Sequence, residues 1–193
     1  MSAAAARVLA ETRAWVRHAV VGLNLCPFAK APLVKEQIRY VVSEAHDTHM
    51  LLDVLREELE TLVRADPEQI ETTLVIHPRV LDDFTEFNDF LDEAEHLLDT
   101  MDLTGVIQVA SFHPQYCFAG TDDADMGNAT NRSPYPTLHL LREASVERAV
   151  AAFPEADTIF EANIRTLEAL GAEGWAAVQA QCRRDAEQPA DPP

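Results

Sequence analysis

Three short apolar runs alternate along the chain with longer segments of helical periodicity. The runs at 36–43, 71–77 and 104–112 are rich in Ile, Val and other strand-forming residues. Between them, 47–64 and the segment that opens at Asp82 or Asp83 carry apolar residues at intervals of three and four. This order is typical of consecutive strand–helix–strand units. We therefore predict an α/β fold with three or more mostly parallel strands and crossover helices.

Additional helices are predicted at both ends of the chain. The first covers about 4–21, and Pro136 is well suited to the first position of another, since its fixed backbone angle matches a helix start. We expect two or three helices after this proline, at roughly 137–153, 157–170 and 173–184. We expect a single domain over 1–184 and a disordered tail over 185–193, which is polar and rich in proline.

The charge balance narrows the classes of partner. The chain of 193 residues has a net charge of -18, which argues against nucleic acid or an anionic membrane as a partner. No apolar run approaches the roughly 18 residues of a membrane span. Cys26, Cys117 and Cys182 show no CxxC spacing, which suits a reducing compartment. We expect a cytoplasmic protein.

Two of the predicted strands end in His-Pro, at His77 and at His113. The carboxyl ends of parallel strands lie along one edge of a sheet, and open α/β sheets bind ligands outside that edge. Both imidazoles would then face one site. The alternative is that each His-Pro only ends a strand, with the imidazole capping backbone groups. The sequence leaves both interpretations open.

A second polar cluster precedes the helix expected at Pro136. The helix start would present free N–H groups and a positive dipole end to an anion. Arg142 would lie partly buried on that helix, where its guanidinium needs an anion from the protein or from a ligand. Cys117 lies in the long polar segment before the cluster and is the more accessible thiol. The other candidate residues here are Asn131, Arg132, Ser133, Tyr135 and His139.

Several long stretches of the chain resemble one protein family. They are GLNLCPFAK, ETTLVIHP, FTEFNDFLDEAEHLL, GVIQVASFHPQYCFAG and TNRSPYPTLHLLREASVERAV. Together they cover roughly 10–175 and resemble the bacterial domain-of-unknown-function family numbered 1415. The resemblance implies a cytoplasmic bacterial protein of one domain, and it assigns no catalytic residue.

The favoured functional hypothesis is an enzyme with a pocket at the carboxyl ends of the strands. Its substrate would be a small anion, a carboxylate or a phosphate. An imidazole would act as general acid or base, because it titrates near neutral pH. The catalytic candidates are His113, His139, Tyr135 and Cys117. The substrate-binding candidates are Asn131, Arg132, Ser133, Arg142 and His77.

Two other hypotheses stay open. In the first, His77, His113 and His139 bind zinc or iron, since three nitrogen ligands with an open position suit a catalytic metal. In the second, the protein is a non-catalytic ligand-binding or regulatory module. The sequence names neither a substrate nor an oligomeric state.

Overall fold

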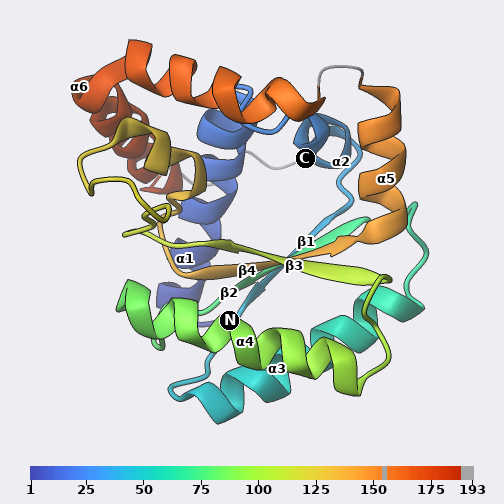
Figure 1. Cartoon of the computed structure of the whole chain (residues 1–193). Helices are drawn as coiled ribbons and strands as arrows, with labels where there is room; N and C mark the ends of the chain where they lie inside the picture. Colours follow the sequence, from blue (N-terminus) through green and yellow to red (C-terminus); the bar gives the residue numbers. More distant parts are fainter. Residues whose placement is uncertain (154–155, 188–193) are drawn as a thin grey trace.

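The fold is a four-stranded sheet covered by helices on both faces (Figure 1). The computed structural model describes residues 1–153 and 156–187. In chain order the elements are α1 (Ala3–Trp15), the π-helix η1 (Val16–Val21), η2 (Pro27–Ala29), α2 (Lys30–Val34), β1 (Ile38–Val42), α3 (Thr48–Arg64), β2 (Thr72–Ile76), α4 (Phe84–Thr100), β3 (Ile107–Phe112), η3 (Met126–Asn131), β4 (Thr137–Arg142), α5 (Glu143–Ala152), η4 (Ala156–Thr158) and α6 (Ile159–Glu187). The predicted single α/β domain with helices at both ends is confirmed.

The sheet has the strand order β1-β2-β4-β3. The expectation of mostly parallel strands is wrong, because β1 and β2 form the only parallel pair among the described strands and β4 is antiparallel to both of its neighbours. β4 also lies between β2 and β3, so these two strands are not neighbours in the sheet. Since β2 and β3 both oppose β4, the three predicted strands still run in one direction. Their carboxyl ends therefore share one edge of the sheet.

The strand β4 corrects the helix predicted over 137–153. Thr137–Arg142 pairs along its whole length with β2 and β3, and the helix α5 begins only at Glu143. A short apolar run can form either a buried strand or a helix. Here it forms a strand, because β2 and β3 pair with it on its two sides. The helix start expected at Pro136, with its N–H groups and dipole, is therefore absent.

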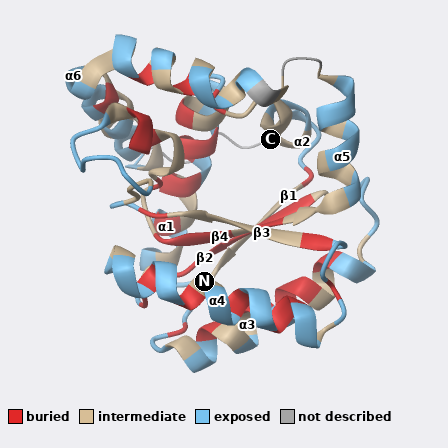
Figure 2. Cartoon of the chain, in the orientation of Figure 1, coloured by how far each residue is buried: buried red, intermediate tan, exposed pale blue. Residues whose placement is uncertain are grey.

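Two hydrophobic cores lie on the opposite faces of the sheet. Val75, Leu138 and Leu140 pack with α3 and α4 on one face. Leu74 and Ile76 pack with α1 and α6 on the other face, as alternation along β2 requires. Figure 2 shows buried residues along the strands and on the helix sides that face them.

The helix boundaries largely follow the sequence signals. Asp47 and Asp83 cap α3 and α4, where their carboxylates accept from backbone N–H groups of the first turn. The predicted break between the last helices is a kink in α6 at Gly171, whose φ of 66° favours glycine. The predicted tail over 185–193 overlaps the end of α6, and residues 188–193 lie outside the described residues. No helix in the described part of the chain is long and apolar enough to cross a membrane.

Candidate functional site

The two His-Pro histidines lie side by side under α4 and hold a loop in place. The Nδ1–H of His77 donates to the carbonyl of Val80 at 3.0 Å, and the Nε2–H of His113 donates to the carbonyl of Leu81 at 3.1 Å. Both rings pack against Phe87, with centroids 5.7 and 5.0 Å from its ring. Both side chains are fully buried. Both histidines lie at the same edge of the sheet. Their contacts match the alternative interpretation of His-Pro, in which each imidazole caps backbone groups.

Burial also decides the charge of these imidazoles. It lowers the pKa of His77 to about 4 and lowers the pKa of His113 as well. Both rings are therefore neutral near pH 7. A neutral imidazole can still donate one N–H to a backbone carbonyl, as each of these rings does.

His139 lies on the opposite face of the sheet. It is paired in register with Leu74 and Ala110 in the middle of β4, and its Nε2–H donates to Thr72 Oγ1 at 2.7 Å. Burial lowers the pKa of His139 to about 4. The structure therefore does not bring the three proposed metal ligands together. No group of three or more His, Cys, Asp or Glu side chains in the described residues is arranged to hold a metal ion.

Arg142 lies at the other end of β4, away from the His-Pro edge. Its guanidinium donates to the carbonyls of Leu62, Ala65 and Ile70 at 2.6, 2.9 and 3.1 Å. The first two carbonyls belong to the end of α3, where helical carbonyls lack partners within the helix. Backbone carbonyl oxygens therefore take the place of the anion that we expected beside this guanidinium. Arg142 is not part of the cluster at 131–135.

The polar segment before β4 is tied down by its own side chains. Asn128 is fully buried, and its amide oxygen accepts from the N–H of Phe118 while its amide nitrogen donates to the carbonyl of Asp122. Asn131 donates to the carbonyl of Ser111. The thiol of Cys117 lies inside this network, 3.7 Å from the Asn128 nitrogen. These side chains order the segment.

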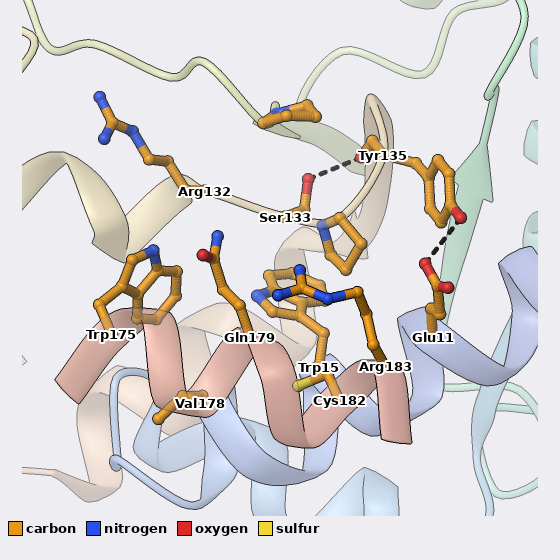
Figure 3. Close-up of a pocket in the computed structure, with 12 residues that line it drawn as sticks. Glu11, Trp15, Arg132, Ser133, Tyr135, Trp175, Val178, Gln179, Cys182 and Arg183 are labelled. Carbon is orange, nitrogen blue, oxygen red and sulfur yellow. Dashed lines mark hydrogen bonds between the residues drawn. The ribbon is translucent and has the colours of Figure 1, made fainter. Parts of the chain in front are cut away.

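A cavity of ≈ 180 Å³ lies next to this segment, between the loop at 132–135, α1 and α6 (Figure 3). Pro114, which follows His113, also lines it, so the cavity lies at the predicted edge of the sheet. Its walls are partly aromatic and apolar and partly polar. The lining residues central to its chemistry are Glu11, Trp15, Ser133, Tyr135, Trp175 and Arg183.

One side of the cavity is held by a hydrogen-bonded group of three side chains. Tyr135 Oη donates to Glu11 Oε2 at 2.7 Å, and Arg7 Nε donates to Glu11 Oε1 at 2.8 Å. Burial and the bond to Glu11 raise the pKa of Tyr135 to about 12, so the phenol stays protonated. Ser133 is buried and donates to the carbonyl of Tyr135, which shapes the loop above the cavity.

The arginines near the cavity differ in their contacts. The Arg132 guanidinium donates to the carbonyls of Tyr116 and Asp123, at 3.0 and 2.9 Å, and Figure 3 shows it extending away from α6. Arg183 lies between α6 and the loop that carries Ser133 (Figure 3). Its guanidinium has no hydrogen bond or ion pair to any described residue. Arg183 is therefore the available cation of this site.

Three of the residues proposed from the sequence line this cavity, namely Arg132, Ser133 and Tyr135. Trp15, Trp175 and Arg183 also line it and were not proposed from the sequence. Both tryptophans of the chain line this cavity, and each is almost completely buried. A usable signal was Glu11, a carboxylate on the buried side of α1. Charged side chains are rarely buried without a partner.

Cys182 also lines the cavity, but its environment opposes a nucleophilic role. Burial is the main reason that its pKa is raised to about 11. The thiolate is the reactive form of cysteine, and this thiol stays protonated near pH 7. Burial likewise raises the pKa of Cys26.

The chain belongs to the family described as "Protein of unknown function (DUF1415)", whose model matches residues 7–177. The family resemblance of the sequence is thereby confirmed. No curated protein and no solved structure matches the chain.

Proposed function

We propose that this member of the DUF1415 family binds a small organic anion in the cavity between α1, α6 and the loop at 132–135. One observation carries the proposal: Arg183 lines an aromatic-walled cavity and has no partner among the described residues. A guanidinium has five N–H donors in a planar fork that matches a carboxylate or a phosphate. A bound anion would use these donors.

The walls favour an anion with an apolar body. Trp15 and Trp175 are 4% and 8% exposed, so the surrounding residues hold their rings in place. The rings therefore offer a rigid apolar surface against which a ligand can pack. Val178 and Pro134 extend this apolar part of the wall. Pockets for drug-sized ligands are usually about 300 Å³ or larger. At ≈ 180 Å³, this cavity suits a small metabolite.

The local charge supports an anion in spite of the charge of the whole chain. The chain carries -18, which repels anions from the general surface. The lining of the cavity, however, includes two arginines, Arg132 and Arg183, and one carboxylate, that of Glu11. Arg183 has no partner among the described residues, so its positive charge is available to an anion.

The proposal assigns binding to the cavity and leaves out acid–base catalysis by an imidazole. His77, His113 and His139 do not line it, and each ring is engaged elsewhere. This geometry favours the ligand-binding module among the hypotheses drawn from the sequence.

Isothermal titration of the full chain with 4-methylpentanoate, 3-phenylpropanoate and inorganic phosphate tests the proposal. We expect saturable binding of a carboxylate, weakened at least about tenfold by Arg183→Ala, because a hydrogen-bonded charge contributes about 1.5–3 kcal/mol. Arg184→Ala is the matched control. It removes the same charge from the next residue, which bonds to Gln181 outside the cavity. Equal affinities of the two variants would contradict the proposal, as would a lack of binding to every anion.

A further inference from the structure

Glu11 and Arg183 carry opposite charges on the wall of one cavity and do not form an ion pair with each other. The Glu11 side chain is only 9% exposed. Each of its oxygens accepts one bond, from Arg7 or from Tyr135. A carboxylate offers about four acceptor positions, so Glu11 can accept further bonds. The cavity therefore presents a free cation and an anion with spare acceptor capacity.

We infer that the ligand is a zwitterion of the amino-acid type, with its carboxylate on Arg183 and its ammonium group facing Glu11. This inference rests on the proposed function and specifies its ligand class. A ligand with both charges satisfies both ends of the wall. A simple carboxylate satisfies Arg183 alone and leaves the spare acceptor positions of Glu11 unused.

The tryptophans support the same ligand class. Indole rings attract cations over their faces, and Trp is the strongest of the aromatic side chains in this respect. Trp15 lies on α1 one turn after Glu11, so the carboxylate and an indole share this part of the wall. An ammonium group there would meet both, and an apolar ligand side chain would pack against the remaining aromatic and aliphatic surface.

Arg7 does not remove this preference. It neutralises Glu11 from the outside, where the Arg7 side chain is 61% exposed and its charge is screened by solvent. The Tyr135 hydroxyl is neutral. The side of Glu11 that faces the cavity thus keeps its negative character.

The test compares matched ligands on the full chain. L-Alanine, L-valine, L-leucine, L-methionine and L-phenylalanine are titrated beside the carboxylic acids that lack only the amine. We expect at least one amino acid to bind about tenfold or more tightly than its matched acid, as one charged hydrogen-bonded contact provides. Glu11→Gln should abolish this preference. Arg184→Ala should keep it, because Arg184 bonds to Gln181 and does not line the cavity.

The outcomes separate the two proposals. Equal binding of every amino acid and its matched acid overturns the zwitterion and leaves anion binding in place. Failure of all acids and all amino acids to bind overturns both. The comparison of ligands on the unmodified chain decides even if Glu11→Gln does not fold.

Discussion

Tyr135 donates a 2.7 Å hydrogen bond to Glu11, a residue 124 positions earlier in the chain. The bond connects the loop before β4 to α1 and closes one side of the cavity. It is charge-assisted and partly buried, and both properties increase its contribution to stability.

Removal of this hydroxyl should destabilise the fold. Tyr135→Phe leaves Glu11 Oε2 without its donor, and we expect the free energy of unfolding to fall by about 1–2 kcal/mol in urea denaturation. Tyr116→Phe is the control, because the Tyr116 hydroxyl makes no side-chain hydrogen bond to the described residues. Equal losses in the two variants would show that the bond to Glu11 contributes nothing.

The buried histidines should make the protein sensitive to acid. The pKa values of His77 and His139 are lowered to about 4, against about 6.5 in the unfolded chain. Between these values the unfolded chain binds protons that the folded chain does not. The contribution of both groups to stability is therefore complete above pH 6.5 and is lost as the pH falls towards 4.

Urea denaturation at pH 7, 6 and 5 measures this loss. His139→Gln should reduce the slope of stability against pH in this range, whereas His96→Gln, at an exposed position of α4, should leave it unchanged. Identical slopes in the wild type and in His139→Gln would refute the assignment.

Arg142 should matter for stability and not for ligand binding. Arg142→Ala removes the guanidinium donor from the carbonyls of Leu62, Ala65 and Ile70, and we expect a loss of about 2–3 kcal/mol in urea denaturation. Arg148→Ala, which removes only an exposed bond to Ser145, should change stability by less than about 0.5 kcal/mol. A change in ligand affinity of Arg142→Ala at constant stability would contradict its role as a structural residue.

Intrinsic fluorescence should report ligand binding directly. The chain has two tryptophans, Trp15 and Trp175, and both line the cavity. We expect a bound carboxylate or amino acid to change the emission intensity or wavelength with the same dissociation constant that titration calorimetry gives. Trp175→Phe should reduce the signal change and weaken binding, since its ring forms part of the wall. A ligand that binds with no change in emission would place the site elsewhere.

Local patterns in the sequence determined much of this protein. Apolar periodicity located β1, β2, β3, α3 and α4, and the caps Asp47 and Asp83 marked where two helices begin. The common direction of the three predicted strands also placed His77 and His113 at one edge. The strands, helices and caps follow from interactions within a few residues. The common direction of the strands follows from the geometry of the strand–helix–strand unit.

Tertiary structure alone decided the remainder. The run TLHLLR has no local preference strong enough to choose between helix and strand, and the hydrogen-bonding edges of β2 and β3 on its two sides made it β4. Arg142 obtained backbone carbonyls of α3 as partners for the same reason, since no local pattern places them there. The cavity joins Trp15 of α1 with Trp175 of α6. Burial, partners and pKa values at such a site depend on which distant segments pack together, and the local sequence around each residue does not contain that information.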